Sequence, residues 1–511
     1  MGLRADLKAR GVWTAYQRYV LMLEPILEQM SARGLPVTRA NYDEVKAKLE
    51  VHRTGIFEAM QTLVPEECQP FHPAKGYKKE PKDAVMGGTT THGKGENEEP
   101  AVWGRRYFPH EVVDEVSRGV IDERWVKLLL WTPSPKNLIA YMKYRKHPIP
   151  ANYKTGKATT DQTELGRLAK KTKDLLYNVV LEYREISTVI DNHVKNWEPS
   201  NDDRVHPTFY YETGTGQLAS RRPNVQNAPK HKKATADIFR SMVEAPDGYT
   251  ILSFDYKSFH AQTLAFEAQD PDYLRLAKLD IHSFLAAYLV READRDRLLS
   301  LPDVELAARL ATIRERHSAI RDQQAKRAIL GYGFGMGWRK LYMLNQESFG
   351  SQSEAKRVLD TLNGLFPRAC RWRDEVRMRA HEQGYLMSRA GCIRWFWEVF
   401  KWDGTKLVPG GDDSESAVAF LPANDAFCHI KDAMLRLNAS GALAGFGLIN
   451  QIHDDLMFLC PDERVDEAVV SIKGEMERPS EILIDPIVAP AGLSVEVGVS
   501  RGKRWNEMKK V

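Results

Sequence analysis

The sequence predicts an α+β fold whose sheet is assembled from segments that lie far apart along the chain. Blocks with helical periodicity alternate with mixed blocks that contain short strand-like runs, and this alternation leads to the prediction. No internal repeat is visible. The 511 residues, at about 150 per domain, allow three to four domains or lobes and a large buried core.

Helical periodicity dominates the first part of the chain. Within residues 15–50, apolar side chains recur at three- and four-residue spacing, as in YVLMLEPILEQM, and Gly34-Leu-Pro36 ends the helix. Residues 160–197 are also predicted to be helical and partly amphipathic, with patterns such as TELGRLAKK and LLYNVVLEYREISTVIDNHVKNW.

After Pro199 the pattern changes to short strands. VHPTFYYET and YTILSFDY have strand character, with turn residues between them. Residues 272–385 return to long helical patterns. The runs LINQI and LMFL then flank His453-Asp454-Asp455, which predicts a hairpin with acidic residues at its tip.

Residues 66–110 differ from both kinds of block. They are polar, rich in Gly, Lys and Glu, and poor in aliphatic residues, which predicts a long surface loop or partly disordered insertion. GTTTHGKG at 88–95 nearly matches a phosphate-binding P-loop. A glycine replaces its closing Ser or Thr and no buried strand precedes it, so we do not predict a phosphate site there.

Composition limits the class of protein. Charged residues make up 28% and hydrophobic residues 43%, as in an ordinary globular protein. No run of about 18 apolar residues exists, so no membrane span is predicted, and the N-terminus lacks the apolar stretch of a secretory signal. The five scattered cysteines form no C-x-x-C pair, which argues against a disulfide framework or a cysteine zinc site and favours a reducing compartment.

Basic residues cluster in one stretch. The net charge of +4 (73 minus 69) says little by itself. Between Lys136 and Lys173, however, ten Lys or Arg residues stand against only Asp161 and Glu164. This clustering predicts either a surface that binds a polyanion or a solvated helical face.

Two segments place carboxylates at strand ends. Asp255 ends the strand-like run YTILSF, and Asp454 and Asp455 lie in the predicted hairpin. Carboxylates from two distant strands that converge on one sheet would form a site for two Mg²⁺ ions, which prefer oxygen ligands and can drive an in-line displacement. Turn or capping aspartates are the alternative.

Two further segments have chemistry suited to a nucleotide or nucleic acid. Lys326, Leu330 and Phe334 follow an i, i+4, i+8 row on one helix face, so a cation, an apolar group and an aromatic ring align. The glycines after Gly331 indicate close packing or a hinge. The loop TGTGQLASRRPNVQNAP at 213–229 carries Asn, Gln and Arg side chains that can bond sugars, phosphates and base edges. An amphipathic helix and a plain loop are the alternatives.

Six segments in order resemble the polymerase portion of family A (DNA polymerase I-like) DNA polymerases of the bacterial or phage type. They are TGTGQLASRRPNVQNAP, SFDYKSFHAQTLAFEA, LDIHSF, QQAKRAILGYGFGMG, INQIHDDLMF and SVEVGVSRGKRWNEM. The resemblance extends from about residue 16 to the end and excludes the 66–110 insertion. It implies a right-hand architecture with an N-terminal segment and thumb in 1–200 (including the 66–110 insertion), a palm with an antiparallel sheet in 201–275 and 391–511, and fingers in 276–390.

The resemblance also implies roles for single residues. Asp255, Asp454 and the carbonyl of Tyr256 would bind two Mg²⁺ ions, for which Mn²⁺ is a substitute. The implied catalytic set is Asp255, Asp454, Asp455 in a supporting role, and Lys326, which would also hold the triphosphate. The implied nucleotide-binding residues are Tyr256, His260, His282, Arg321, Lys326, Leu330 and Phe334. The implied DNA-binding residues are Gln217, Arg222, Asn224, Gln226, Asn227, Asn424, His453 and, in the thumb, Lys136.

Two departures from the family pattern concern arginines. The family commonly has an arginine four residues before the motif lysine, and Asp322 stands there. Either the helix register shifts, or Arg321 and Arg327 share the contact with the phosphates. Gln217 stands where the family usually has a minor-groove arginine, so we expect weaker mismatch sensing there.

A third departure concerns the sugar of the nucleotide. His260 replaces the glutamate that usually blocks a ribose 2′-OH, and Phe334 replaces the tyrosine to which that glutamate bonds. We expect His260 to fill the space, so that deoxynucleotides remain preferred with looser discrimination.

The resemblance implies template-directed DNA synthesis from dNTPs on primer–template DNA. A single-subunit RNA polymerase-like enzyme, a polymerase with relaxed sugar selectivity, and a nucleic-acid-binding scaffold without chemistry are the alternatives. No segment resembles a 3′–5′ exonuclease, and a processivity factor or separate exonuclease is not assigned. We expect no membrane association and a location in the cytoplasm of a bacterium or a phage-infected host.

Overall fold

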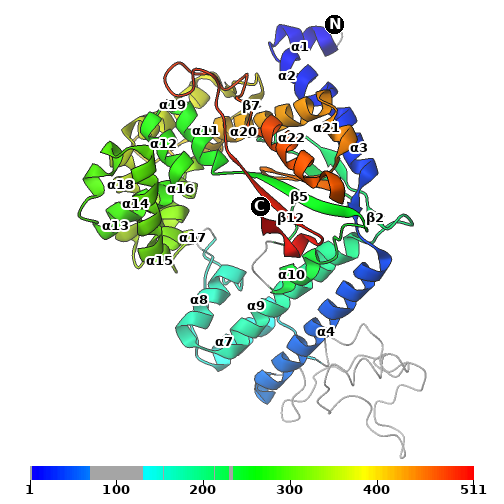
Figure 1. The fold of residues 1–511 in the computed structure, drawn as a ribbon. Coiled ribbons are helices and arrows are strands. Elements are labelled where there is room, and N and C mark those ends of the chain that lie inside the picture. The colour runs from blue at the N-terminus through cyan, green and yellow to red at the C-terminus, as the bar shows by residue number, and fades with distance from the viewer. Residues whose placement is uncertain (1–2, 69–129, 153–154, 212, 230–233) are drawn as a thin grey trace, which may run out of the picture. The chain divides into compact units, whose positions relative to one another are not determined.

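The computed structural model describes residues 3–68, 130–152, 155–211, 213–229 and 234–511 (Figure 1). The chain forms two compact units. The sheet unit comprises Met1–Asn41, Trp197–Ala228 and Arg240–Val511, and the helical unit comprises Tyr42–Asn196 and Pro229–Phe239. The predicted thumb segment 1–200 is thus divided between both units, and the boundaries of thumb, palm and fingers stay predictions. Most of the predicted polar insertion, residues 69–110, lies outside the described residues.

The helical unit is built around apolar side chains. Its elements are α4 (Arg39–Leu63), which begins in the sheet unit, η2 (Glu66–Cys68), α7 (Pro135–Tyr144), α8 (Gln162–Thr172), α9 (Leu175–Thr188), η4 (Val189–His193), η5 (Val194–Asn196) and α10 (Ala234–Arg240). Its core includes Met60, Trp131, Leu138, Leu165, Tyr177 and Val180. The Asp161 carboxylate caps α8 by accepting a hydrogen bond from the N–H of Glu164 at 2.9 Å. The helical prediction for 160–197 is confirmed.

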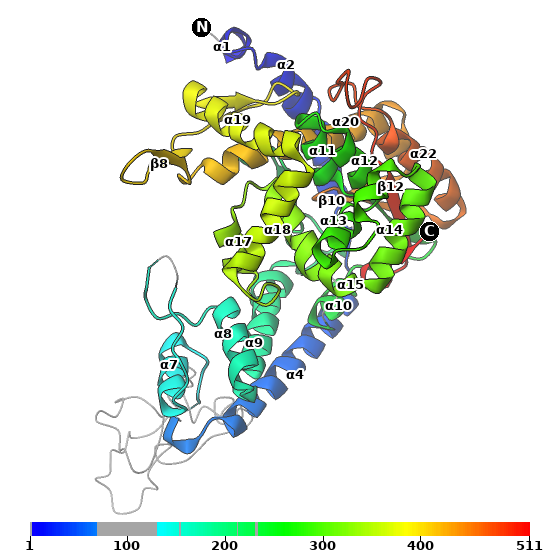
Figure 2. The same cartoon turned by 90° about the vertical axis from the view of Figure 1, so that its left-hand side faces the viewer.

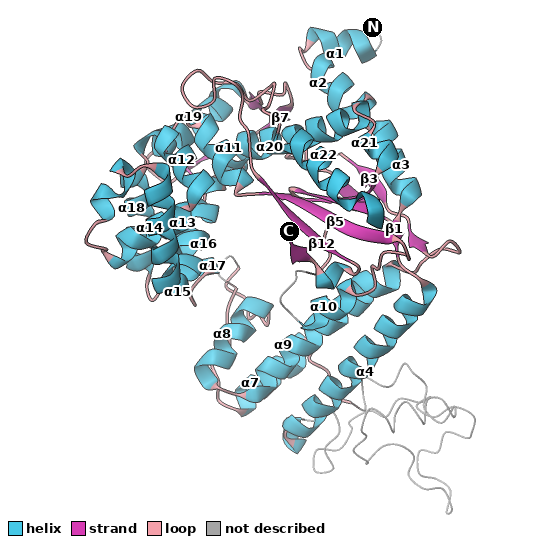
Figure 3. Ribbon diagram, in the orientation of Figure 1, coloured by secondary structure: helices cyan, strands magenta, loops and turns pink. Residues whose placement is uncertain are grey.

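The sheet unit is organised around a five-stranded antiparallel sheet with the order β10-β11-β5-β12-β13 (Figure 3). The strands are β5 (Tyr249–Tyr256), β10 (Gly447–Ile452), β11 (Asp455–Pro461), β12 (Val497–Gly502) and β13 (Lys509–Lys510). The central strand β5 pairs with β11 on one side and with β12 on the other. The predictions of a sheet assembled from distant segments and of a hairpin around 453–455 are therefore confirmed.

Helices from three parts of the chain pack around this sheet. They are α11 (Phe259–Glu267), α20 (Ser414–Ala439) and α22 (Val465–Glu477), with the short α21 (Ala442–Gly445) and η8 (Asp462–Arg464) beside them. Helix α22 contacts β11 and β12, while α20 lies among α11, α19 and α22 and is buried along most of its length. A helix buried on nearly all sides positions its side chains rigidly.

A block of helices separates β5 from α20 in sequence (Figure 2). It contains α12 (Pro271–Leu279), α13 (Ile281–Val290), η6 (Arg295–Ser300), α14 (Asp303–Arg316), α15 (Ser318–Ile320), η7 (Arg321–Ala325), α16 (Lys326–Gly333), α17 (Trp338–Leu344), α18 (Gln352–Leu365) and α19 (Pro367–Gln383). The helical prediction for 272–385 is confirmed. The π-helical turn η7 inserts an extra residue directly before α16.

Short elements complete the sheet unit. They are α1 (Leu3–Ala9), α2 (Trp13–Tyr16), η1 (Gln17–Leu21), α3 (Glu24–Arg33), β1 (Leu35–Pro36), β2 (Arg204–Val205), β3 (Thr208–Tyr210), β4 (Ala219–Arg221), β6 (Tyr385–Met387), β7 (Ile393–Trp395), β8 (Phe400–Trp402), β9 (Leu407–Pro409) and η9 (Trp505–Glu507). The short strands pair as β1–β2, β3–β4, β6–β7 and β8–β9.

Gly34 ends α3, as its position in the sequence predicted. Its φ is +62°, and a Cβ there would lie 2.8 Å from the carbonyl oxygen of Val205. Only glycine suits such a close approach in the left-handed region. The helix resumes as α4, which extends beyond the predicted end at residue 50 to Leu63. Among the described helices, none is long and apolar enough to cross a membrane.

Candidate active site

The hairpin β10–β11 brings the predicted carboxylates to one end of the sheet. Asp455, the first residue of β11, pairs in register with Asp255 of β5. His453 turns the chain with a φ of 56°, and Asp454 follows it. The N–H of Tyr256 donates to the carbonyl oxygen of Asp454 at 3.2 Å, which ties the hairpin tip to the end of β5.

The carboxyl groups of Asp255 and Asp454 share a hydrogen bond. Burial, together with the nearby Asp255 carboxyl, raises the pKa of Asp454 to about 8. Partial removal from water also raises the pKa of Asp255, although this side chain keeps contact with solvent. The two carboxylates repel each other when both are ionised. A divalent cation bound between them would offset this repulsion, so the pair fits a metal ion.

Asp455 is held by the sheet. Its Oδ2 accepts a hydrogen bond from the Ser253 hydroxyl, and its Oδ1 is buried without a hydrogen-bond partner. Burial raises the pKa of Asp455 to about 7. Within the part of the chain that the structure describes, no group of three or more His, Cys, Asp or Glu side chains could hold a metal. The candidate metal ligands are therefore two carboxylates, those of Asp255 and Asp454, and the backbone oxygen of Tyr256. So small a set suits Mg²⁺, because this ion keeps waters and substrate oxygens in its coordination shell.

A buried aromatic cluster supports the end of β5. The Tyr256 hydroxyl donates to the carbonyl oxygen of Met476 at 2.7 Å. The ring of His429, on α20, meets the rings of Tyr256 and Phe259 edge-on, each at 5.4 Å. Burial lowers the pKa of His429 to about 3, so this imidazole is neutral at pH 7. The sequence analysis missed His429, because only the packing of α20 places it there.

A cavity of about 200 Å³ adjoins the hairpin tip. Its lining includes Asp454 together with four of the predicted nucleotide-binding residues, namely His260, His282, Leu330 and Phe334. Leu330 and Phe334 are large apolar side chains that nevertheless remain 46% and 42% exposed. An apolar wall beside the Asp454 carboxyl suits a flat ring attached to a charged group.

His260 meets Phe334 at the wall of this cavity. Their ring centroids lie 5.1 Å apart in an edge-on arrangement, so the contact is between rings and not a hydrogen bond. Burial, and more weakly His453, lower the pKa of His260 to about 4. Phe334 follows the end of α16, where Gly335 (φ +71°) donates to the Tyr332 carbonyl oxygen at 3.0 Å in a left-handed cap. The hinge or close-packing prediction for these glycines agrees with a Cβ at Gly335 lying 3.0 Å from Val418 Cβ.

The predicted phosphate-binding side chains have different surroundings. Lys326 is exposed at the start of α16 and close enough to His282 to affect the imidazole's charge. Burial lowers the pKa of His282 to about 4. Arg321 bonds Asp280 at 3.1 and 3.2 Å, and Asp280 also caps α13 through the N–H of Ser283. The π-helical turn at 321–325 shifts the helix register, which was one of the two expected explanations for Asp322.

The loop 213–229 also contacts the hairpin. The Gln217 side-chain amide donates to His453 Nδ1 at 2.8 Å. The Gln226 amide donates to the carbonyl oxygen of Gln451 at 2.9 Å and to its Oε1 at 3.0 Å. Asn224 uses its Oδ1 to hold the loop by accepting from two backbone N–H groups at 3.1 Å. The predicted DNA-binding residues Arg222, Asn224 and Asn227 are exposed.

Asn424 differs from the other predicted DNA-binding residues. It is 2% exposed, and its amide donates to the Thr215 carbonyl oxygen at 3.0 Å. Lys431, about two turns further along α20, donates to the Gly216 carbonyl oxygen at 2.6 Å. Buried Asn424 therefore positions the loop 213–229 through the Thr215 carbonyl oxygen. Its position in the sequence did not reveal this role.

Lys136 lies in the helical unit, exposed at the start of α7. Other exposed members of the predicted basic stretch are Lys143, Arg145, Lys146, Lys157, Lys170, Lys171 and Lys173, whereas Lys154 lies outside the described residues. Binding of a polyanion by this stretch stays a prediction, with a solvated helical face as the alternative.

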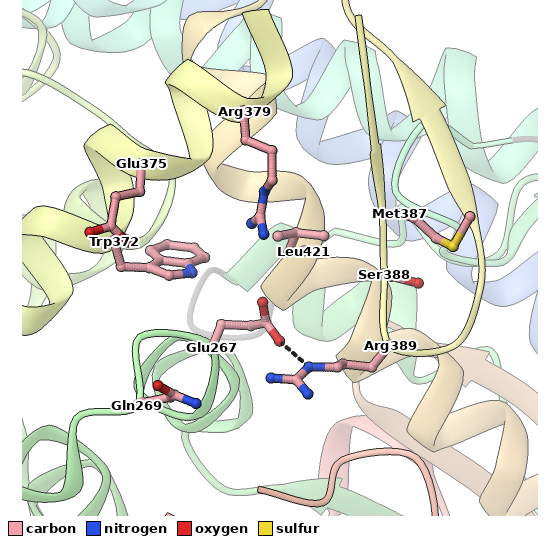
Figure 4. A pocket seen from close by; sticks show the side chains of 9 residues that line it. All are labelled: Glu267, Gln269, Trp372, Glu375, Arg379, Met387, Ser388, Arg389 and Leu421. Atoms are coloured by element: carbon pink, nitrogen blue, oxygen red, sulfur yellow. Dashed lines mark hydrogen bonds and ion pairs between the residues drawn. The ribbon is translucent and has the colours of Figure 1, made fainter. Parts of the chain in front are cut away.

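A second cavity, of about 290 Å³, contains none of the predicted site residues. Figure 4 shows Arg379 from α19 and Arg389 pointing into it, with Glu267 bonded to Arg389 at 3.3 Å. Glu267 also bonds Asp425, and burial with the charge of Glu267 raises the pKa of Asp425 well above its usual value. We assign this pair a structural role.

Comparisons with known proteins identify relatives of this chain. A curated DNA polymerase I of Treponema pallidum (strain Nichols) is 26% identical over 376 residues, which cover 72% of this chain and 34% of that protein. A thermostable DNA polymerase I of Thermus filiformis is 27% identical over 371 residues, which cover 71% of this chain and 40% of that protein. The chain thus spans between a third and two fifths of the length of these relatives.

A solved structure has the same fold. It is described as the POL domain of Pol1 from M. smegmatis in complex with DNA primer-template and dNTP, and it matches with a TM-score of 0.68 and 19% identity. The match covers 99% of this chain and 73% of that one. The predicted α+β, right-hand polymerase architecture is thereby confirmed. The family model "DNA polymerase family A" matches residues 129–298 and 304–507, more than half of the sequence, so the chain belongs to DNA polymerase family A.

Proposed function

We propose that this chain is a DNA-directed DNA polymerase that extends a primer 3′-OH with dNTPs and releases pyrophosphate. One observation carries the proposal: Asp454, whose carboxyl is hydrogen-bonded to that of Asp255, lines a cavity together with Leu330 and Phe334. Acidic ligands and an apolar wall together match the two ends of a nucleoside triphosphate. Membership of the family supports the same activity.

Asp255, Asp454 and the carbonyl of Tyr256 would hold two Mg²⁺ ions, or Mn²⁺ in their place. Bound there, the ions would activate the primer hydroxyl and stabilise the leaving oxygen of an in-line displacement. Asp455 keeps the hairpin in register with β5 through Ser253 and adds negative charge to the site. The His429 ring packs against the ring of Tyr256 and so supports the end of β5.

On the nucleotide side, Lys326 and His282 would contact the triphosphate. Lys326 is exposed and charged, which suits a phosphate contact and transfer of a proton to pyrophosphate. Arg321 has its guanidinium bonded to Asp280, so we propose that it orients the start of α13, and with it His282. Leu330 and Phe334 would pack against the sugar and the base.

Primer–template DNA is the proposed partner. Gln217, Arg222, Asn224, Asn227 and His453 would contact the duplex near the primer end. Buried Gln226 and Asn424 would act by holding those groups. Lys136 and the basic stretch around it would contact phosphates. We place this activity in the cytoplasm of a bacterium or of a phage-infected host, and assign no processivity factor or exonuclease.

Relaxed sugar selectivity is a second candidate property. The ring contact between His260 and Phe334 lacks the hydrogen bond that a glutamate and a tyrosine would form. The wall next to the sugar is therefore set by ring packing alone, so ribonucleotides would be excluded less strictly.

Primer extension with separate dNTP and rNTP pools tests the proposal. Asp454→Ala should lower the extension rate by at least about 1,000-fold, because electrostatic stabilisation of developing charge is lost. Its affinity for primer–template DNA should stay within severalfold. Asp360→Asn, on the exposed face of α18, is the matched control and should extend normally. Robust extension by Asp454→Ala would refute the two-carboxylate assignment, and unprimed synthesis from rNTPs would favour an RNA polymerase-like enzyme.

A further inference from the structure

Two cysteines outside the proposed active site lie next to each other. Cys392 directly precedes β7 and Cys428 lies on α20, and their Sγ atoms are 3.9 Å apart. Cys428 is fully buried, whereas Cys392 is half-buried and lines a cavity of about 330 Å³. A small solute can therefore reach one sulfur while the other is shielded from it.

We propose that Cys392 and Cys428 form a peroxide-reactive dithiol whose oxidation to a disulfide bond loosens the loop 213–217. The thiol chemistry is independent of the proposed function, and only its consequence for primer extension rests on it. Transient disulfides of this kind are the form in which oxidation acts on proteins of reducing compartments.

The two thiols differ in acidity, with a lowered pKa at Cys392 and a raised pKa at Cys428. The hydrogen bond from the Cys428 thiol, assisted by the nearby Lys431 ammonium, lowers the pKa of Cys392 to about 7. Burial raises the pKa of Cys428 well above its usual value. Cys392 thus carries a large thiolate fraction at pH 7 and is the nucleophile, since the thiolate is the reactive form.

The reaction balances with hydrogen peroxide as the oxidant. The Cys392 thiolate attacks one peroxide oxygen, the O–O bond breaks, hydroxide leaves, and a sulfenic acid forms on Cys392. The Cys428 sulfur then attacks the Cys392 sulfur, the S–O bond breaks, and the S–S bond forms. The proton of Cys428 leaves with the hydroxyl as water. The two thiols lose two electrons, the peroxide gains them, and a dithiol reductant reverses the change.

The structure lets the sulfurs meet at small cost. They must close from 3.9 Å to about 2.05 Å. Cys428 is fixed by the buried helix α20, so the movement falls on Cys392. Cys392 follows Gly391 (φ +79°) in the turn between β6 and β7, a short connection that can adjust more readily than a buried helix.

A chain of hydrogen bonds connects Cys428 to the acidic hairpin. The single hydrogen of the Cys428 thiol can be donated either to the Cys392 sulfur or to Asn424 Oδ1, which lies 3.6 Å from Cys428 Sγ. The Asn424 amide in turn donates to the Thr215 carbonyl oxygen at 3.0 Å. Two residues further on, Gln217 donates to His453. In the disulfide the Cys428 sulfur has no hydrogen, so Asn424 loses that donor.

Tight packing passes any shift of Asn424 to the loop. A Cβ at Gly216 would lie only 2.5 Å from Asn424 Nδ2, so the loop backbone rests directly on this amide. Oxidation therefore disturbs the loop whose Gln217 bonds His453.

Peptide mapping of the full chain tests the thiol chemistry. The protein is treated with about a tenfold excess of hydrogen peroxide, free thiols are alkylated, and peptides are analysed by mass spectrometry. We expect a linked Cys392–Cys428 peptide, two hydrogens lighter than its reduced parts, that disappears with dithiothreitol. Cys392→Ser should form none, and Cys370→Ser, which alters another half-buried cysteine, should form it normally. Absence of the linked peptide from the wild-type protein overturns the proposal.

Primer extension provides the second readout. Oxidised wild-type protein should extend severalfold more slowly and recover with dithiothreitol, whereas Cys392→Ser should extend equally with and without peroxide. A disulfide that forms without changing extension overturns the link to the loop. If even the reduced protein does not extend primers, the proposed function fails, and limited proteolysis of the loop 213–217 in reduced and oxidised protein still tests the link.

Discussion

The acidic end of the sheet and the proposed nucleotide cavity are built in different ways. Asp255 and Asp455 lie in register on strands most of whose apolar residues are buried, and a backbone hydrogen bond ties Asp454 to Tyr256. The cavity wall instead belongs to α16, a helix of 8 residues between a π-helical turn and a glycine cap, with its apolar side chains partly exposed. The proposed metal ligands are thus held by strand pairing, and the proposed nucleotide contacts by a short, partly exposed helix.

This contrast predicts that changes on the cavity side alter catalysis without altering stability, and that changes in the buried framework do the reverse. Three substitutions test the contrast, in decreasing order of the expected effect.

Lys326→Ala should have the largest effect of the three. Loss of a charge-assisted contact of about 3 kcal/mol with the triphosphate corresponds to a drop of about 100-fold in kcat/KM for dNTPs. The melting temperature should not change, because Lys326 is exposed. Single-nucleotide incorporation and thermal denaturation measure both. Lys356→Ala, on the exposed face of α18, is the control. An unchanged kcat/KM would remove Lys326 from the proposed site.

His260→Ala should raise the efficiency of rGTP relative to dGTP by roughly tenfold, because the imidazole no longer fills space beside the sugar. With its pKa lowered to about 4, His260 is neutral above pH 6, so the ratio should not vary between pH 6 and pH 8. His317→Ala, at the end of α14, is the control. Equal ratios in both variants would mean that another group excludes the 2′-OH.

Asp425→Asn should have the smallest effect, and it should act on stability. Burial raises the pKa of Asp425 in the folded protein, so the folded state binds this proton more tightly than the unfolded state does. Stability is therefore lost as the pH rises above the usual carboxyl pKa. Asparagine removes this loss and can still bond Glu267. Glu267 and Arg389 are the charged groups that act on Asp425, and Arg379 acts on Glu267.

The expected gain is about 1 kcal/mol at pH 8 and less at pH 5, measured by denaturant unfolding at both values. Primer extension should be unaffected. If the variant were less stable than the wild-type protein at pH 8, the Glu267–Asp425 pair would not lower the free energy of unfolding at high pH, and the assignment would be wrong. Asp360→Asn again provides the control, since Asp360 is exposed.

Sequence reasoning found the parts of the site that depend on strand pairing and on the order of segments. Asp255 and Asp454 could be predicted because each ends or follows a short apolar run, and because their motifs occur in a characteristic order. Spacing predicted Leu330 and Phe334 on one helix face. Leu330 does lie on α16, but the helix ends at Gly333 and Phe334 directly follows it, so the helical row was wrong for Phe334, although both side chains line the cavity.

The remaining features depend on contacts that spacing does not encode. Asn424 bonds a carbonyl oxygen 209 positions away, so its burial beneath a loop follows only from the folded chain. Arg321 bonds Asp280 across 41 positions, and the π-helical turn next to it has no simple sequence signal. His429 and the Cys392–Cys428 contact likewise exist because α20 runs through the centre of the sheet unit.

The pairing of β5 with β11 has a consequence for the order of folding. Ser253 and Asp455 bond across 202 positions, and the whole block α12–α19 lies between them in the chain. Local helices form in microseconds, whereas strands that distant must first overcome the entropy of closing a long loop. Far-UV ellipticity should therefore return early during refolding, and the ability to bind divalent ions should be among the last properties that the chain acquires.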